Sequence, residues 1–214
     1  MLPPAGCGPL GRVILALDTS TAACTAALFD DGAKCIASRD EQIGRGHAER
    51  LAPMLDEMLE GRRADTILVG VGPGSFTGIR VGLAAAHGLA IGWNARIFGI
   101  SSLALLTASA GSGSEAAAAV NGGHGELFVQ QFDRGLHPAG DLLNLSPADA
   151  AAAVSTDIVV GPGAEALVAA RGSGTATLAW PRASFAMLLP AELRSLPAVP
   201  VYARPPDAKT RTAA

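Results

Sequence analysis

The stretch that decides the fold is Ile67-Leu-Val-Gly-Val-Gly-Pro-Gly-Ser-Phe-Thr-Gly-Ile-Arg80. It opens with a short apolar run rich in β-branched residues, which predicts a buried strand. The turn Gly72-Pro73-Gly74 ends that run, because glycine tolerates positive φ and proline fixes its own φ. Ser75 or Thr77 can then cap a helix, which the sequence predicts over residues 75–93.

A stripe of small residues runs along this predicted helix. Gly78, Gly82, Ala86 and Ala90 recur every four residues and therefore share one face. A glycine inside a helix costs roughly 1 kcal/mol relative to alanine. The close approach of another backbone is the usual compensation, so the stripe indicates a tight contact.

Three nucleotide-binding or catalytic motifs are excluded at this turn. A Walker loop needs a lysine, and none occurs between Lys34 and Lys209. A dinucleotide fingerprint needs a third glycine where Ser75 stands, and an acid about 20 residues later. Residues 66–114 contain no Asp or Glu. The glycines around Ser75 also lie at the wrong offsets for a Gly-x-Ser-x-Gly nucleophile elbow.

Composition bounds the class of protein. The chain has 214 residues, of which 49% are hydrophobic but only 16% charged, and its net charge is −3. This length suits one compact domain or two small ones. So few charges favour a face that is shared with a partner. A chain that binds nucleic acid by itself normally has a block of basic residues, and this sequence has none.

The cysteines and the N-terminus give expectations about the compartment. The three cysteines form no Cys-x-x-Cys pair, which favours reduced thiols in a cytoplasmic protein. Residues 1–11 lack the basic and apolar regions of a signal peptide and predict a disordered leader. The most apolar charge-free run, residues 81–95, falls short of the roughly 20 residues that a membrane span needs. We expect no membrane association.

The first half predicts strands that open as a meander and then alternate with helices. Strands are expected over residues 12–19, 21–29, 33–38, 67–71 and 96–100, and helices over 44–60, 75–93 and 102–110. This order implies a mixed sheet with helices packed on it.

The second half resembles a weaker copy of the first. Strands are expected over 116–120, 125–132 and 157–160, and helices over 147–153, 164–170 and 183–196. Gly161-Pro162-Gly163 repeats the earlier glycine–proline turn. An internal duplication of this kind fits two similar lobes that face a cleft.

The expected boundaries follow from this duplication. A short Gly/Ser linker over residues 111–114 is the best candidate boundary between the halves. We expect an N-terminal lobe over 12–110, a C-terminal lobe over 115–208 and a disordered tail over 209–214.

Several blocks of this chain resemble the TsaB (YeaZ) family in their order and spacing. They are Ile14-Leu-Ala-Leu-Asp-Thr-Ser-Thr21, His47-Ala-Glu-Arg-Leu51, Gly72-Pro-Gly-Ser-Phe-Thr-Gly-Ile-Arg80, Ser101-Ser-Leu103 and Tyr202-Ala-Arg204. The resemblance implies a two-lobed α/β fold of the actin/hexokinase/Hsp70 (ASKHA) type, with mixed sheets flanked by helices and a smaller, degenerate second lobe. One block departs from the family, because Asn121-Gly122-Gly123 stands where relatives carry Asp-Ala-Arg.

The resemblance also implies a function and partners. TsaB-like proteins are the non-catalytic partner of a TsaD-like enzyme, which makes N6-threonylcarbamoyladenosine beside the tRNA anticodon. We expect a heterodimer with that enzyme through the first two helices, and a homodimer when the enzyme is absent. A TsaE-like ATPase joins the assembly, and tRNA is contacted only indirectly. No cofactor, metal or catalytic residue is expected in this chain.

The expected partner interface lies on the first two helices. One helix contributes a histidine, leucine and methionine face, and the other contributes the small stripe and an arginine. The residues are His47, Leu51, Met54, Met58, Gly78, Arg80, Gly82 and Ala86. His47 has no second histidine four residues later, since Leu51 stands there, and one imidazole cannot hold an iron or zinc centre.

The main alternative is a small-molecule kinase or ATPase of the same fold. Asp18 ends the first predicted strand, where such enzymes place an acid that faces phosphate or metal. Thr19 follows it, and Gly161 and Gly163 could approach a phosphate. These four residues are the candidates for a weak nucleotide contact, although Asp18 can equally cap its own hairpin. A bare homodimeric adaptor is a third possibility.

Overall fold

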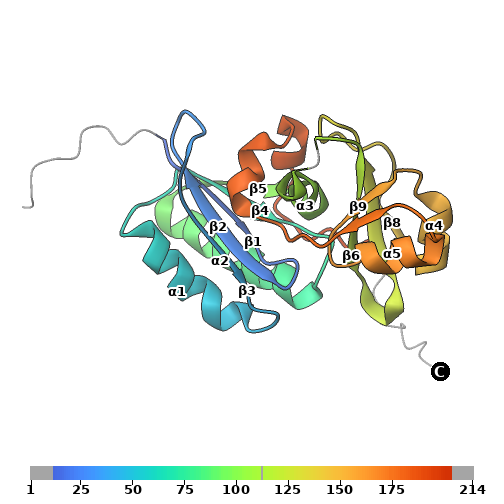
Figure 1. Ribbon diagram of the computed structural model, residues 1–214. Helices are drawn as coiled ribbons and strands as arrows, with labels where there is room; N and C mark the ends of the chain where they lie inside the picture. The colour runs from blue at the N-terminus through green and yellow to red at the C-terminus, as the bar shows by residue number, and fades with distance from the viewer. Residues whose placement is uncertain (1–11, 112, 204–214) are drawn as a thin grey trace, which may run out of the picture.

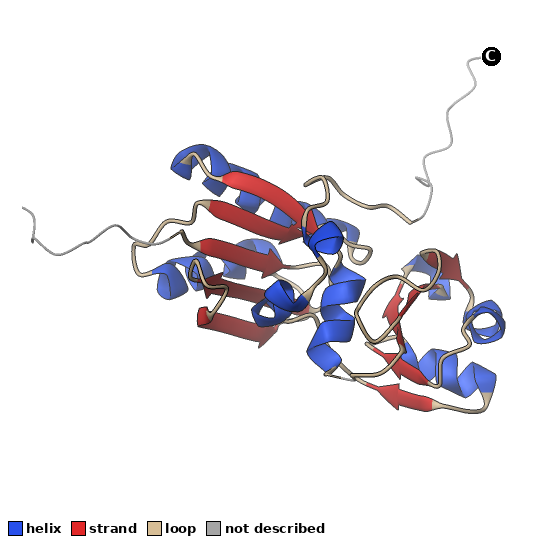
Figure 2. Cartoon of the chain, turned by 90° about the horizontal axis from the view of Figure 1, so that it is seen from above, coloured by secondary structure: helices blue, strands red, loops and turns tan. Residues whose placement is uncertain are grey.

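The computed structural model describes residues 12–111 and 113–203, which form two five-stranded sheets (Figures 1 and 2). The first sheet has the order β3-β2-β1-β4-β5 and the second the order β10-β9-β6-β7-β8. The strands of the first sheet are β1 Ile14–Asp18, β2 Ala23–Phe29, β3 Cys35–Gln42, β4 Thr66–Gly70 and β5 Arg96–Ile100. Those of the second are β6 Ala116–Asn121, β7 Leu127–Phe132, β8 Leu143–Leu145, β9 Ile158–Val160 and β10 Thr175–Thr177.

Both sheets have the same topology. In the first sheet β1 and β3 pair antiparallel with β2, while β4 pairs parallel with both β1 and β5. In the second, β6 and β8 pair antiparallel with β7, while β9 pairs parallel with β6 and β10. Reading each sheet from its own first strand gives the order 3-2-1-4-5 twice. The predicted duplication is therefore present, and the two-lobed α/β fold is confirmed.

The helices form three layers around the sheets. Their bounds are α1 His47–Leu59, α2 Phe76–Trp93, α3 Ser102–Ala110, α4 Pro147–Ala153 and α5 Ala164–Arg171. Helices α1 and α2 cover one face of the first sheet, and α4 and α5 cover the outer face of the second. Helix α3 lies between the two sheets (Figure 1).

Helix α3 joins the two halves because it is mostly apolar and is buried on every side. Leu103, Leu105 and Leu106 are fully buried in one cluster. That cluster also contains Leu68 from the first sheet and Val160 from the second. A helix that is hydrophobic all round must be buried on all sides. The two sheets therefore share a core around α3.

Strand β6 explains the many alanines of the second half. Its first four residues, Ala116 to Ala119, are all completely buried. Ala116 and Ala118 face the shared core, whereas Ala117 and Ala119 face α4 and α5. Because side chains alternate across a strand, both faces of β6 are covered, and small side chains let both helix layers approach closely.

The C-terminal segment differs from the prediction. The expected helix over 183–196 is wrong, because the chain forms two short 3₁₀ helices there, η2 Ala183–Leu188 and η3 Ala191–Arg194. Pro190, which lacks an N–H group, separates them. Strands β8 and β10 were not predicted, and each has only three residues.

This segment returns to the first sheet. Element η2 packs against α3 and β2, and Gly99 of β5 forms a bridge with Leu196. The backbone N–H of Val201 donates to the carbonyl oxygen of Val71 at 2.8 Å. The expected division into lobes over 12–110 and 115–208 stays a prediction about domains. The expected leader over 1–11 and tail over 209–214 lie outside the described residues.

Candidate partner surface and inter-sheet cleft

Asp18, at the carboxyl end of β1, is held by hydrogen bonds from its own chain. The backbone N–H and the hydroxyl of Ser20 each donate to Oδ1 at 2.7 Å. The hydroxyl of Ser102, the first residue of α3, donates to Oδ2 at 2.6 Å. The same Ser102 oxygen accepts the N–H of Gly72 at 3.1 Å. Asp18 therefore connects the β1–β2 turn, the glycine turn and α3.

The surroundings of Asp18 leave it little chemistry beyond this. Its side chain is only 1% exposed, and a Cβ on Gly70 would lie 1.9 Å from Oδ2. Burial raises the pKa of Asp18 above its ordinary value, against the opposing effect of the hydrogen bonds from Ser102 and Ser20. A phosphate or metal could reach the carboxylate only if these neighbours moved. The predicted capping of the hairpin is confirmed.

The small stripe of α2 packs against the turn that follows Asp18. The hydroxyl of Thr19 donates to the carbonyl oxygen of Gly78 at 2.7 Å. A Cβ on Gly78 would lie 2.0 Å from the carbonyl oxygen of Thr19, and one on Gly82 would lie 2.5 Å from Oγ1 of Thr19. The close backbone approach that the stripe indicated is real, but it occurs within this chain.

The predicted interface must be corrected accordingly. Seven of its eight residues are buried in the chain's own core, and only the arginine is exposed. The buried residues are His47, Leu51, Met54, Met58, Gly78, Gly82 and Ala86. His47 lies with Nε2 3.2 Å from the carbonyl oxygen of Ala23, and the larger apolar residues pack on the first sheet. These side chains are not available for a partner.

The turn before α2 performs the role that was predicted for it. Ser75 caps the helix, because its hydroxyl accepts the N–H of Gly78 at 3.2 Å. Gly72 has a φ of 98°, which favours glycine. A Cβ on Gly74 would lie 2.1 Å from the carbonyl oxygen of Ser20. The structural turn Gly72-Pro73-Gly74-Ser75 thus seats α2 directly on the β1–β2 turn.

The outer side of α1 and α2 is a different surface, and we call it the outer helix face. On α2 it consists of small and apolar residues with Ile91 84% exposed, and on α1 it carries acids. We define this face by the exposed residues Ala84, His87, Gly88, Ile91 and Gly92 on α2, and Ala48, Glu49, Ala52, Pro53, Asp56 and Glu57 on α1. A Cβ on Gly88 or Gly92 would meet nothing within 4 Å. Nothing in the described chain explains why these helix positions are glycines.

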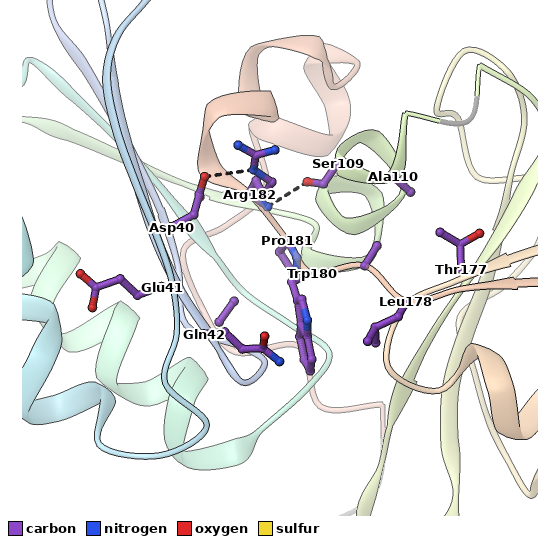
Figure 3. Close-up of a pocket in the computed structure, with 12 residues that line it drawn as sticks. Asp40, Glu41, Gln42, Ser109, Ala110, Thr177, Leu178, Trp180, Pro181 and Arg182 are labelled. Carbon is purple, nitrogen blue, oxygen red and sulfur yellow. Dashed lines mark hydrogen bonds and ion pairs between the residues drawn. The ribbon is translucent and has the colours of Figure 1, made fainter.

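Two cavities lie between the sheets and share Trp180 as a wall. The larger, of about 350 Å³, lies between β3 and the segment that follows β10, and Figure 3 shows Trp180 standing between Gln42 and Leu178. Two acids, Asp40 and Glu41, line it, and Asp40 accepts a hydrogen bond from Nε of Arg182 at 3.0 Å. The smaller cavity, of about 200 Å³, is lined by the β1–β2 turn and by Ser75, Asn121, Pro162 and Trp180.

The residues predicted to contact a nucleotide do not line either cavity. Gly161 and Gly163 make room for the backbone of β6, since a Cβ on Gly161 would lie 2.4 Å from the carbonyl oxygen of Ala119. Asp18 and Thr19 face the interior contacts described above. A nucleotide contact through these four residues stays a prediction, and each of them already has a role within the fold.

Among the described residues, no three His, Cys, Asp or Glu side chains gather as metal ligands could. Within the same residues, no helix combines the length and apolarity that crossing a bilayer requires.

Comparison with known proteins points to one family. A family model described as TsaD, tRNA N6-adenosine threonylcarbamoyltransferase, matches residues 36–185. The "tRNA threonylcarbamoyladenosine biosynthesis protein TsaB" of Escherichia coli is 33% identical over 129 residues, which are 56% of this chain and 55% of that protein. The Haemophilus influenzae protein of the same name is 38% identical over 129 residues, which are 56% and 54% of the two chains. The match thus spans about half the length of these curated relatives.

A solved structure matches over a greater length. The structure of YeaZ from Pseudomonas aeruginosa superposes with a TM-score of 0.73 and 28% identity, and covers 89% of this chain and 99% of that one. A second solved structure is that of a protein described as similar to peptidase YEAZ from Pseudomonas aeruginosa. It superposes with a TM-score of 0.75 and 30% identity, and covers 90% of this chain and 100% of that one.

Two glycines of α2 test the distinction between its inner stripe and the outer helix face. Gly78→Ala places a methyl group against the backbone of Thr19 and should cost about 1–3 kcal/mol of folding free energy. Gly88→Ala enters open space and should gain up to about 1 kcal/mol. Urea unfolding of both variants measures the difference between their free energies of unfolding. The contribution of helix propensity cancels from this difference, because both variants replace glycine by alanine inside α2. Equal stability of the two variants would contradict the packing described for Thr19.

Asp18 predicts a specific pH dependence. Burial raises the pKa of Asp18 in the folded protein, whereas the unfolded chain ionises near 3.8. Above that pH the folded state binds more protons than the unfolded state, so the contribution of Asp18 to the free energy of unfolding falls as pH rises. Asp18→Asn removes this titration. The free energy of unfolding of the wild type, minus that of the variant, should therefore fall as pH rises above about 4 in urea unfolding. A difference that grows with pH would contradict the account.

Proposed function

Because the chain belongs to the TsaB (YeaZ) family, we propose that it is a non-catalytic subunit that holds and activates a TsaD-like threonylcarbamoyl transferase. The transferase would modify the tRNA adenosine beside the anticodon to N6-threonylcarbamoyladenosine. The names of the Escherichia coli and Haemophilus influenzae relatives support a role in this modification. We propose a cytoplasmic location on the same basis.

One observation supports the non-catalytic role most strongly. The kinase or ATPase alternative needs the acid at the end of β1 to face a phosphate or its metal. Both oxygens of Asp18 instead accept hydrogen bonds from Ser20 and Ser102, and Gly70 closes over the carboxylate. A buried carboxylate whose two oxygens already accept three hydrogen bonds from its own chain contributes to structure and not to phosphoryl transfer.

The outer helix face supports a helix-packing partner. Gly88 and Gly92 follow Ala84 at intervals of four residues and lie side by side along the exposed surface of α2. Exposed glycines destabilise an isolated helix, but they allow the backbone of another helix to approach to about 8 Å. Ile91 beside them supplies apolar area. A pair of helices that buries about 800 Å² on each partner would be an interface of standard size.

The occupant of this face depends on which proteins are present. We propose that the TsaD-like transferase binds there as a heterodimer and that a second copy of this chain binds there when the transferase is absent. Acids on α1 such as Asp56 and Glu57 are exposed, while α2 carries no acid. A two-fold pairing that sets α1 of one copy against α2 of the other therefore avoids contact between two acidic surfaces. A TsaE-like ATPase would join the assembly elsewhere, and tRNA would be contacted through the transferase.

The proposed function is tested with the cognate transferase. Threonylcarbamoyl transfer from preformed threonylcarbamoyl-adenylate to tRNA is measured with and without this chain, with the TsaE-like protein present. Transfer should require the chain, and the chain alone should transfer nothing and hydrolyse no ATP. Transfer that proceeds equally without the chain would contradict the proposal. ATP turnover by the chain that Asp18→Asn abolishes would favour the kinase alternative.

A pair of glycine variants extends the same assay to the outer helix face. Gly88→Leu should abolish binding of the transferase and the threonylcarbamoyl transfer that depends on it, because a leucine side chain prevents another helix from packing closely. The substitution should not disturb the fold, since a Cβ at Gly88 meets no atom of this chain within 4 Å. Gly140→Leu is the matched control, since its Cβ also meets nothing within 4 Å and it lies on the β7–β8 connection. Binding that survives Gly88→Leu would contradict the placement of the interface.

A further inference from the structure

Two sequence motifs that lie far apart meet on the surface beside α2. Phe76 and Arg80 stand one turn apart on the helix, and Tyr202 comes from the C-terminal segment that runs along it. The guanidinium carbon of Arg80 lies 3.5 Å from the centre of the Phe76 ring. Its Nε donates to the hydroxyl of Tyr202 at 3.1 Å, and the two aromatic rings are 5.4 Å apart. The cluster Phe76–Arg80–Tyr202 therefore fixes the direction of one arginine.

The C-terminal segment is itself held in place along α2. The N–H of Val201 donates to the carbonyl oxygen of Val71 at 2.8 Å. About two turns beyond Arg80 along α2, Nε2 of His87 lies 3.1 Å from the carbonyl oxygen of Ala198. Tyr202 is thus positioned by backbone contacts of its segment. Because Tyr202 orients the Arg80 side chain before any ligand binds, the side chain is preorganised for binding.

This cluster contributes little to the fold. Phe76 is 53% exposed and Tyr202 46% exposed, and Arg80 is exposed as well. A cation–π contact at an exposed site is worth only about 0.5–1 kcal/mol, while ordering an arginine side chain costs up to about 2 kcal/mol. The arrangement is better explained by a ligand than by stability.

The arginine has unused hydrogen-bonding capacity. Only Nε is bonded within the described residues, which leaves both terminal nitrogens without a protein acceptor there. No described carboxylate forms an ion pair with Arg80, and residues 66–114 contain no acid at all. A guanidinium fork that is held along one edge presents parallel N–H groups, which match a carboxylate in geometry and charge.

We propose that the cluster Phe76–Arg80–Tyr202 is an anchor for a carboxylate side chain, aspartate or glutamate, on the transferase subunit of the proposed function, on which this inference rests. The cluster continues the outer helix face along α2, so one partner can cover both. Arginine and tyrosine are enriched among interface residues that carry most of the binding energy, and aromatic rings beside a charge exclude water from it.

The surroundings favour a protein over a nucleic acid. Arg80 is the single Lys or Arg of α2, and the nearby segment exposes Val199 and Val201. One fixed cation in an apolar setting suits one carboxylate. A nucleic acid instead requires several cations that neutralise successive phosphates, and the chain as a whole has a net charge of −3.

The test measures binding of the full-length chain to the cognate transferase by isothermal titration. Arg80→Ala should weaken the affinity about 30-fold or more, as removal of a buried interface arginine does. Arg80→Lys keeps the charge but loses the fork, and should weaken it about tenfold. Tyr202→Phe removes the acceptor that aligns Nε and should weaken it by a smaller factor. Arg134→Ala, which removes one exposed positive charge from the second half, is the matched control and should bind like wild type.

Raising the salt concentration separates an ion pair from apolar packing. Affinity of the wild-type chain should fall with salt more steeply than that of Arg80→Ala, and thermal unfolding of each variant should match wild type. Wild-type affinity and salt dependence in Arg80→Ala would overturn the anchor while leaving the proposed function intact. No binding of the wild-type chain to the transferase would overturn both. Loss of tRNA retardation in Arg80→Ala, with transferase binding unchanged, would assign the cluster to RNA instead.

Discussion

The contact between the β1–β2 turn and the start of α2 is the constraint on which the rest of the structure depends. Gly78 and Gly82 bring the helix so close to Thr19 that no side chain fits between them. The same turn carries Asp18, whose hydrogen bonds extend the contact to α3 and the glycine turn. Because the inner side of α2 is buried against its own chain, a partner can contact only the outer side of the helix. The position that we propose for the interface thus follows from how the core is packed.

The duplication shows how this arrangement became specialised in one half. Both sheets have the strand order 3-2-1-4-5 with the same pattern of parallel and antiparallel pairs. The second half lacks the acid at the end of its first strand, where β6 ends in the exposed Asn121. Its helices α4 and α5 have seven and eight residues, against 18 for α2. The long helices, and with them the outer helix face, belong to the first half.

The regular elements were predictable because their signals are local. Helix α3 runs over Ser102–Ala110 and β5 over Arg96–Ile100, at the predicted residues, because serine caps and apolar runs mark their ends. Strands of three residues, such as β8 and β10, are too short to show alternation. The helix expected over 183–196 failed because Pro190 interrupts the backbone hydrogen bonds that a continuous helix needs.

The candidate site was only partly predictable. The spacing of Gly78 and Gly82 correctly indicated a close backbone contact, but small residues are required equally by a core contact and by an interface. Only the position of Thr19, 59 residues away, shows which contact it is. Arg80 and Tyr202 are 122 residues apart, so their meeting depends on the path of the C-terminal segment along α2. Local patterns contain no information about such a contact.

Hydrogen–deuterium exchange tests the central claim most directly, because it reports which backbone amides become protected when the cognate transferase binds. The account predicts new protection along α1 and α2 and in the segment around Tyr202, with no change around Trp180 in the inter-sheet cleft. Protection confined to the cleft, or to α4 and α5, would contradict the assignment of the partner surface to the first two helices.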